Sequence, residues 1–206
     1  MTEGTTRILF LPGAGGSPNF WKPVASALPD AWTKEHFGWP GLGAQPHDPA
    51  VNGIDDLVAM VTAKMDAPVD LVAQSMGGVI AARLAIEKPA LVRRLVLCVT
   101  SGGVDMAGLG ASDWRESYRR SFPQAAEWIT AARASPPLPV ERIVAPTLLI
   151  WGDADPISPV AVGKHLEQRL PDARLEIVAG GDHDVASTHA DHVARLISSF
   201  LSAPAR

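Results

Sequence analysis

The sequence predicts a single α/β domain in which a mainly parallel, doubly wound β-sheet is flanked by helices. Short, continuous apolar runs alternate along the chain with segments whose apolar residues recur at helical spacing. Strands that are apolar throughout are buried on both sides, which is typical of parallel sheets covered by helices. The 206 residues suit one such domain, and because no internal repeat interrupts them we expect residues 1–206 to form one unit.

Breaks in the apolar pattern place the elements of the first half of the chain. The first apolar run stops at a turn with three glycines, and a later one stops at Gln74-Ser75-Met76-Gly77-Gly78, so both are expected to be buried strands that end in tight turns. Apolar residues at helical spacing indicate the helices between the strands. In chain order we expect a strand over 7–11, a helix over 20–28, a strand over 32–39, a helix over 53–65, a strand over 69–73, a helix over 78–87 and a strand over 95–99.

The second half continues this alternation after one interruption. About 40 residues, 101–140, precede the next apolar run and hold an aromatic stripe at helical spacing, Trp114, Tyr118 and Phe122. Because a structureless loop of that length is unusual, we expect a helical insertion packed over the C-terminal edge of the sheet. The remaining expected elements are a strand over 147–151, a helix over 160–170, a strand over 175–178 and a helix over 190–201.

Composition argues against several classes of protein. The formal net charge is −4 and basic residues cluster only in pairs, whereas a nucleic-acid-binding protein usually carries a basic surplus. The single cysteine, Cys98, excludes an intramolecular disulfide framework and a cysteine-rich zinc site. The apolar runs are too short for a membrane span, and the run over 8–11 is too short for a signal-peptide core. We therefore expect a cytoplasmic protein with no nucleic-acid or membrane partner.

Ser75 is a candidate nucleophile because of its place between a strand and a helix. A side chain at such a sharp turn projects above the sheet, clear of the core. The turn brings strand and helix close together, so small residues are needed two positions to either side, here Ala73 and Gly77. A serine at this place can also serve only as the cap of the following helix, and the turn alone does not separate the two roles.

His183 and an aspartate are the candidate partners of this serine. A serine hydroxyl needs a base, and His183 follows the last expected strand, at the same sheet edge as Ser75. The base needs an acid that holds its tautomer and stabilises the imidazolium. The turn after the strand over 147–151 offers Asp153 and Asp155, and aspartates in such turns often only cap backbone amides. Spacing does not choose between the two.

Two backbone amides are candidates for an oxyanion hole. The amide of Met76 lies at the start of the helix after Ser75, where helix-end amides are unpaired and the helix dipole favours negative charge. A second amide, that of Ala14, is expected from the first glycine-rich turn. Phosphate binding by this turn is disfavoured, because it matches neither G-x-x-x-x-G-K-[ST] nor G-x-G-x-x-G.

Taken together, these motifs resemble those of the α/β-hydrolase family, in which serine, aspartate and histidine follow successive strands in that order. The resemblance covers nearly the whole chain. Residues 11–17 resemble the family's oxyanion turn, with Pro12 where histidine is frequent. Residues 38–43 resemble its D-x-P-G-x-G turn, with Gly38 in place of the acid.

Three further matches lie at the ends of later strands. The turn at Ser75 resembles the family's G-x-S-x-G elbow, from which Ala73 is a mild departure. Residues 151–155 resemble its W-G-x-x-D turn, in which the last aspartate is the acid, so the resemblance implies Asp155 rather than Asp153. Residues 181–183 resemble its G-x-H segment.

The resemblance implies a serine hydrolase that cleaves a carboxylic ester or thioester of a small molecule through an acyl-enzyme intermediate. Its catalytic residues would be Ser75, Asp155 and His183, and it would need no metal or organic cofactor. The same triad in this fold is also known to support carbon–carbon bond hydrolysis, cofactor-free elimination and perhydrolysis, and some relatives are receptors without turnover. These activities remain alternatives, because fold does not fix function.

The resemblance also implies that residues 101–140 form a short helical cap. Its aromatic residues are expected either to line a substrate pocket or to pack the cap onto the sheet; they are Trp114, Tyr118, Phe122 and Trp128. The identity of the substrate and the oligomeric state do not follow from the sequence.

Overall fold

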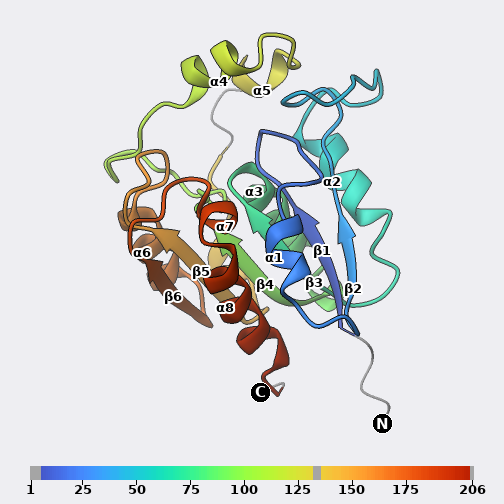
Figure 1. Ribbon diagram of the computed structural model, residues 1–206, viewed down its shortest axis with the longest axis vertical. Helices are drawn as coiled ribbons and strands as arrows, with labels where there is room; N and C mark the ends of the chain where they lie inside the picture. Colours follow the sequence, from blue (N-terminus) through green and yellow to red (C-terminus); the bar gives the residue numbers. More distant parts are fainter. Residues whose placement is uncertain (1–5, 132–135, 205–206) are drawn as a thin grey trace.

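Six parallel strands form one sheet in the computed structural model, which describes residues 6–131 and 136–204 (Figure 1). Their spatial order is β2-β1-β3-β4-β5-β6, and every neighbouring pair is parallel. The strands are β1 (Arg7–Leu11), β2 (Thr33–His36), β3 (Val69–Gln74), β4 (Val92–Cys98), β5 (Thr147–Gly152) and β6 (Ala173–Val178).

Helices cover both faces of this sheet. Helices α1, α7 and α8 pack on one another over one face, in front of the strands in Figure 1, whereas α3 contacts α2 and the inner strands and α6 contacts β5 and β6. This arrangement confirms the predicted class of a mainly parallel, doubly wound sheet. The helices are α1 (Lys22–Ser26), α2 (Ile54–Thr62), α3 (Met76–Glu87), α4 (Arg115–Ser121), α5 (Trp128–Ala131), α6 (Val160–Arg169), α7 (Val185–Thr188) and α8 (Ala190–Ser202), with 3₁₀ turns η1 (Pro89–Leu91) and η2 (Val140–Arg142).

Burial explains why these segments are strands. Every residue of β3 and β5 is buried, as expected for strands covered by helices on both sides. Asp70 is the charged residue of β3, and its fully buried carboxylate accepts a hydrogen bond of 2.9 Å from Nε of Arg93 on β4. Burial raises the pKa of Asp70, and the guanidinium opposes that shift.

Tertiary partners move several element boundaries away from those expected. Strand β4 starts at Val92 rather than at residue 95, although its second and third residues are the charged Arg93 and Arg94. The two arginines enter the strand because each has a partner: Arg93 pairs with Asp70, and Arg94 donates to the carbonyl oxygens of Leu201 and Ala203. Pattern analysis places charged residues outside a buried strand, since their partners are distant in the sequence.

The second expected strand also ends earlier than the pattern suggests. It was expected to reach residue 39, but β2 ends at His36, and the amide of Trp39 donates instead to the carbonyl of Gly16 at 2.9 Å. The indole of Trp39 donates to the Pro12 carbonyl at 2.8 Å. Trp39 thus leaves the sheet and braces the turn that follows β1.

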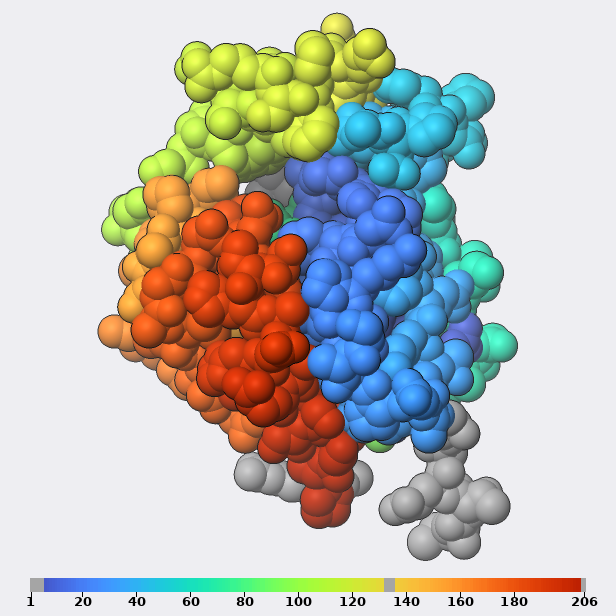
Figure 2. All heavy atoms as spheres, in the orientation of Figure 1, coloured from blue at the N-terminus to red at the C-terminus, as the bar shows by residue number. Residues whose placement is uncertain are grey.

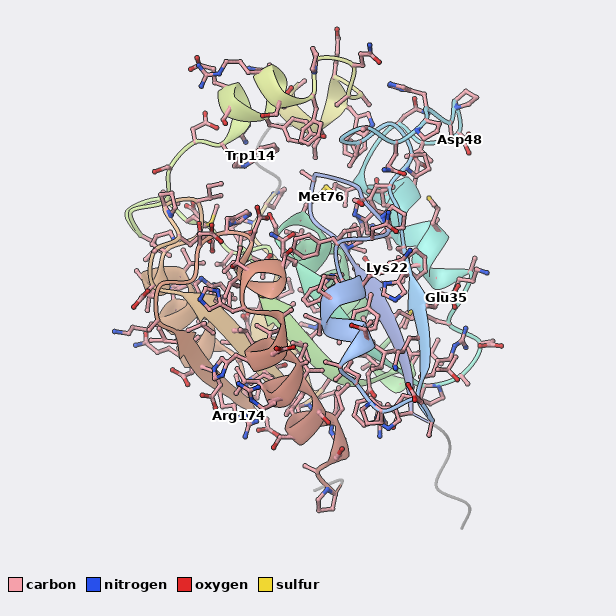
Figure 3. The ribbon with its side chains drawn as sticks, in the orientation of Figure 1. Lys22, Glu35, Asp48, Met76, Trp114 and Arg174 are labelled. Carbon is pink, nitrogen blue, oxygen red and sulfur yellow. The ribbon has the colours of Figure 1, made fainter. Side chains whose placement is uncertain are left out.

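Helices α4 and α5 lie beyond the carboxyl ends of the strands, at the top of Figure 1, and belong to the chain between β4 and β5. Figure 2 shows this segment covering that end of the molecule. In Figure 3 Met76 and Trp114 lie on opposite sides of the space between α4 and the sheet, whereas the labelled charged residues lie on the outer surface. Residues 132–135 of the expected insertion lie outside the described residues.

Neither a membrane-spanning helix nor a metal cluster occurs in residues 6–131 and 136–204. The longest helix, α8, has 13 residues, whereas crossing a bilayer takes about 20 apolar residues.

Candidate active site

Ser75 occupies a strained turn between β3 and α3. Its backbone has φ 51° and ψ −120°, a region that residues with a side chain rarely adopt. The turn is tied to the end of β4, because the Ser75 amide donates to the Cys98 carbonyl at 3.0 Å and the Thr100 hydroxyl donates to the Ser75 carbonyl at 2.5 Å. These bonds hold the strained conformation, which lifts the Ser75 side chain above the sheet.

Gly77 explains why the turn needs small residues. A Cβ atom at Gly77 would lie 2.5 Å from the carbonyl oxygen of Pro12 and 2.6 Å from that of Leu11. The first turn of α3 therefore packs directly on the backbone at the end of β1. Ala73, on the strand side, is fully buried, so the structure accommodates a methyl group there in place of the family's glycine.

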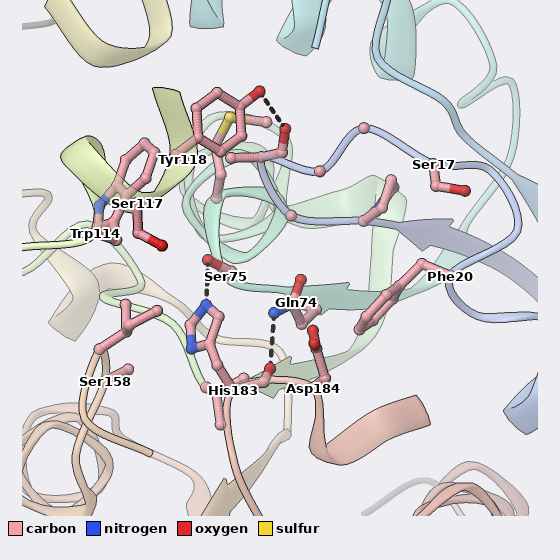
Figure 4. A pocket seen from close by; sticks show the side chains of 18 of the residues that line it. Ser17, Phe20, Gln74, Ser75, Trp114, Ser117, Tyr118, Ser158, His183 and Asp184 are labelled. Carbon is pink, nitrogen blue, oxygen red and sulfur yellow. Dashed lines mark hydrogen bonds between the residues drawn. The ribbon is translucent and has the colours of Figure 1, made fainter. Parts of the chain in front are cut away.

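Ser75, His183 and Asp155 form one continuous row of hydrogen bonds. Nε2 of His183 lies 3.0 Å from the Ser75 Oγ, as Figure 4 shows, and Nδ1 of His183 lies 2.7 Å from Oδ2 of Asp155. Asp155 is 3% exposed. Because a carboxylate only accepts hydrogen bonds, Nδ1 carries the proton and Nε2 is free to accept the proton of Ser75.

The two aspartates of the turn after β5 have different partners. The second carboxylate oxygen of Asp155 accepts the Ile157 amide at 2.8 Å, which fixes the carboxylate plane beside His183. Asp153 is exposed and accepts the Gly180 amide at 2.7 Å, so it braces the turn after β6. The structure therefore brings Asp155 to His183, as the family resemblance implies, and gives Asp153 a different contact.

Met76 and Ala14, whose amides are the expected oxyanion donors, both line the cavity beside Ser75. Met76 is the first residue of α3, and Ala14 lies in the turn after β1. This turn runs against the elbow, since a Cβ atom at Gly13 would lie 3.0 Å from the Cβ of Ser75. Within the described part of the chain neither amide donates a hydrogen bond to another backbone or side-chain group, so both can stabilise an anion.

A cavity of about 520 Å³ opens above Ser75, and α4 forms one of its walls. Three of the four aromatic residues expected in the pocket line it: Trp114, Tyr118 and Phe122. Their rings also pack on one another, with centroids 5.4 Å apart for the first pair and 5.1 Å for the second. The stripe therefore both lines the cavity and packs within the insertion.

Trp128 is not among the residues that line the cavity, and of the two roles expected for it the structure shows packing rather than pocket lining. The chain turns after α4, and the Ala126 amide donates to the Gly41 carbonyl at 2.7 Å. Helix α5 follows, and on it Trp128 packs against the protein core rather than continuing the stripe of α4.

Several polar residues at the cavity were not identified from the sequence. The side-chain amide of Gln74 donates to the His183 carbonyl at 3.0 Å and so holds the loop that carries the base. Asp184, which points toward the cavity in Figure 4, follows His183 directly. Although Asp184 is partly exposed, loss of hydration at the carboxyl raises its pKa, and nearby His183 opposes the shift. Their positions beside Ser75 and His183 are the only sequence signal for either residue.

The chain belongs to the α/β-hydrolase family. The family model described as "Alpha/beta hydrolase family" matches residues 8–134, and one described as "TAP-like protein" matches residues 112–206. Together with the six-stranded parallel sheet and its helices, these matches confirm the predicted α/β-hydrolase fold.

The chain is similar in sequence to an esterase and to a depolymerase. The chain is 24% identical to a pimeloyl-[acyl-carrier protein] methyl ester esterase of Neisseria meningitidis serogroup B, over 98% of this chain and 95% of that protein. It is 26% identical to a poly(3-hydroxyalkanoate) depolymerase of Ectopseudomonas oleovorans, over 95% of this chain and 84% of that protein.

Among solved structures, the enol-lactonase of Burkholderia xenovorans has the same fold. It superposes with a TM-score of 0.78 at 20% identity, covering 97% of this chain and 92% of that one. An esterase of Thermogutta terrifontis superposes with a TM-score of 0.77 at 18% identity, covering 96% and 90%.

Proposed function

We propose that this protein is a serine hydrolase that cleaves a carboxylic ester or thioester of a small molecule through an acyl-enzyme intermediate. The observation that carries the proposal is the row of hydrogen bonds from Asp155 through His183 to the Ser75 Oγ, 2.7 Å and 3.0 Å long. Membership of a hydrolase family, and relatives named for the cleavage of esters, support the same reaction class.

In the acylation step the Ser75 Oγ attacks the carbonyl carbon of the ester while Nε2 of His183 accepts the hydroxyl proton. A serine hydroxyl is a weak nucleophile without such a base. The Asp155 carboxylate holds the proton on Nδ1 and stabilises the imidazolium that forms. Collapse of the tetrahedral intermediate breaks the ester bond, and the imidazolium gives its proton to the departing alcohol or thiol.

Two backbone amides stabilise the negative oxygen of this intermediate. The Met76 amide has the partial positive charge of the α3 N-terminus behind it, and the Ala14 amide approaches from the facing turn. Donors held in place before the reaction need no reorganisation, and one such donor contributes about 3–4 kcal/mol to the lowering of the barrier.

In the deacylation step a water molecule takes the place of the leaving group. Nε2 of His183 accepts a proton from this water, whose oxygen attacks the acyl carbon. The second tetrahedral intermediate uses the same two amides. Its collapse returns the proton to the Ser75 Oγ and releases the carboxylic acid, so the enzyme is restored without a metal or organic cofactor.

The cavity favours a substrate with an apolar, uncharged acyl part. The walls near α4 are aromatic, formed by Trp114 and Phe122, and neither lysine nor arginine is found among the cavity-lining residues described. A carboxylate or phosphate on the substrate would therefore lack a cation. In this proposal residues 1–206 form a single domain, and the insertion over 101–140 acts as a cap that shapes the acyl site.

A fluorophosphonate probe and a panel of aryl esters test the proposal. The probe should label Ser75, and the Ser75→Ala variant should lose labelling and about 10⁴–10⁶-fold in kcat. Ser26→Ala is a matched control on the outer surface, since the exposed Ser26 hydroxyl donates to the Pro23 carbonyl, and it should retain full activity. Wild-type turnover by Ser75→Ala would contradict the proposal.

The substrate panel also separates the other activities of this fold. If the protein hydrolyses none of the esters but does hydrolyse a β-diketone, the result would favour carbon–carbon bond cleavage. Failure of the folded protein to react with the probe would favour a ligand-binding protein without turnover. A cytoplasmic location stays a prediction, which fractionation of the producing cells checks.

Ester hydrolysis should slow at acid pH, because a protonated Nε2 of His183 accepts no proton from Ser75. The rate is measured with one aryl ester across about pH 5 to 8. A flat profile over this range would argue against His183 as the base.

A further inference from the structure

Tyr118 connects α4 to two turns that are far away in the sequence. It is the single tyrosine of the chain, and its side chain is 9% exposed. Its hydroxyl accepts a hydrogen bond from the Gly43 amide at 2.8 Å and donates one to the Ala14 carbonyl at 2.8 Å. Because the only hydroxyl proton is used on Ala14, Tyr118 has none to offer to a substrate oxyanion.

Other carbonyl groups of the oxyanion turn accept hydrogen bonds from groups outside α4. Trp39 supplies two of them, from its indole to the Pro12 carbonyl at 2.8 Å and from its amide to the Gly16 carbonyl at 2.9 Å. The Gly16 amide itself donates to the Gly13 carbonyl at 3.0 Å. The Ala14 carbonyl is instead held by α4, through Tyr118.

This bond restricts the orientation of the Ala14 amide. Ala14 stands between Gly13 and Gly15, and glycine leaves the backbone free to adopt many conformations. The Ala14 N–H belongs to the same peptide group as the Gly13 carbonyl, which accepts a hydrogen bond from the Gly16 amide. The Ala14 carbonyl belongs to the next peptide group, which Tyr118 holds. With the peptide groups on both sides held, the Cα of Ala14 keeps its position and the Ala14 N–H keeps its direction.

On the basis of the proposed function, we propose that Tyr118 is a positioning residue: its hydroxyl holds the turn after β1 so that the Ala14 N–H stays directed at the oxyanion beside Ser75. The bond exists only while α4 lies over the sheet. In Figure 4 the Tyr118 ring lies above Ser75. The helix that forms one wall of the cavity, α4, therefore also positions a donor of the oxyanion hole. Placement of α4 and stabilisation of the transition state are thereby coupled.

The Tyr118→Phe variant separates this role from simple packing. It keeps the ring, which lies between Trp114 and Phe122, and removes only the hydroxyl. We expect kcat for an aryl ester to fall about 10- to 30-fold, less than the 10²–10³-fold loss from deleting an oxyanion donor. KM should stay within about twofold, since substrate binding in the ground state does not depend on the oxyanion contacts.

A trifluoromethyl ketone provides the second readout. Its adduct with Ser75 places a negative oxygen between the two amides, so its inhibition constant should rise by the same factor by which kcat falls. The control is Glu116→Gln, because Glu116 is exposed on α4 and, among the residues described, pairs with Arg120 alone. This control should leave kcat, KM and the inhibition constant unchanged.

Two results would overturn the inference. One is a rise in KM while kcat and the inhibition constant stay unchanged, which would mean that Tyr118 only lines the cavity. The other is no change in any of the three constants. The fluorophosphonate reaction distinguishes these failures from failure of the proposed function: a wild type that does not react contradicts the function, whereas equal rates for wild type and Tyr118→Phe overturn only the role of Tyr118.

Fluorotyrosine gives a test that does not depend on the folding of Tyr118→Phe. Because the chain has one tyrosine, incorporation of 3-fluorotyrosine changes this site alone. Burial raises the pKa of Tyr118, and the hydrogen bond from the Gly43 amide opposes that shift. The fluorine substituent lowers the pKa of the phenol relative to that of the unmodified Tyr118. We expect kcat to fall at a lower alkaline pH than in the wild type, since a phenolate cannot donate to Ala14. Identical alkaline profiles would refute the positioning role.

Discussion

The substitution Asp155→Asn, compared with Asp153→Asn, is the sharpest test of the site geometry. Asp155 accepts two hydrogen bonds, from Nδ1 of His183 at 2.7 Å and from the Ile157 amide at 2.8 Å. An asparagine has one accepting oxygen and one donating nitrogen, so it can satisfy only one of these two donors.

Either orientation of the asparagine impairs His183. With its oxygen on Ile157, the amide nitrogen faces Nδ1 and favours the tautomer in which Nε2 carries the proton and accepts none from Ser75. With its oxygen on His183, the Ile157 amide loses its acceptor, which costs about 1–3 kcal/mol. Loss of the carboxylate charge beside the imidazolium removes about 2–4 kcal/mol more at a partly buried site.

The two contributions centre on about 5 kcal/mol, which corresponds to a loss of about 10³–10⁴-fold in kcat. Asp153→Asn should stay within about threefold of the wild type, because its oxygen still accepts the Gly180 amide. The assay is steady-state hydrolysis of a chromogenic ester, with thermal unfolding to show that both variants fold. Equal losses for the two variants, or more than a tenth of wild-type kcat for Asp155→Asn, would refute the reasoning.

Three further predictions concern stability and reactivity. Gly77→Ala should lower the free energy of unfolding in urea by about 1–3 kcal/mol, because the new Cβ would lie 2.5 Å from a backbone carbonyl oxygen. Gly53→Ala is the control, since a Cβ there would have no atom within 4 Å, and equal stability of the two variants would contradict the close approach. Asp184→Asn should stabilise the fold at pH 7 but not below about pH 4, because the raised pKa of Asp184 means that folding disfavours its charged form. A gain in the free energy of unfolding that persists at low pH would argue against this cause. Cys98 should resist iodoacetamide until the protein unfolds, because full burial raises the pKa of its thiol, and rapid labelling of the native protein would show that the thiol is accessible.

The fold was predictable because its signal is local and repeated. Continuous apolar runs become strands buried on both faces, as in β3 and β5. The structure departs from the pattern where a distant partner compensates a residue: Arg94 enters β4 because the C-terminal carbonyl groups accept its hydrogen bonds. Such partners are more than 100 residues away, so no local pattern contains them.

Ser75 and His183 were predictable as neighbours because of topology. In a parallel sheet the carboxyl ends of all strands meet at one edge, so residues that directly follow different strands come together there. Chain order therefore carries information about space, and the structure brings the two side chains to 3.0 Å.

Sequence alone determined the parallel sheet, the edge at which the polar turns gather and the two turns that face Ser75. Spacing left Asp153 and Asp155 open, the family resemblance implied Asp155, and the structure brings Asp155 to His183. Tertiary structure alone decided that Trp128 is not among the cavity-lining residues and that the Tyr118 hydroxyl reaches Ala14. The physical reason is that backbone class follows from the periodicity of neighbouring residues, whereas the direction of a side chain in a turn or an inserted helix depends on contacts with segments far along the chain.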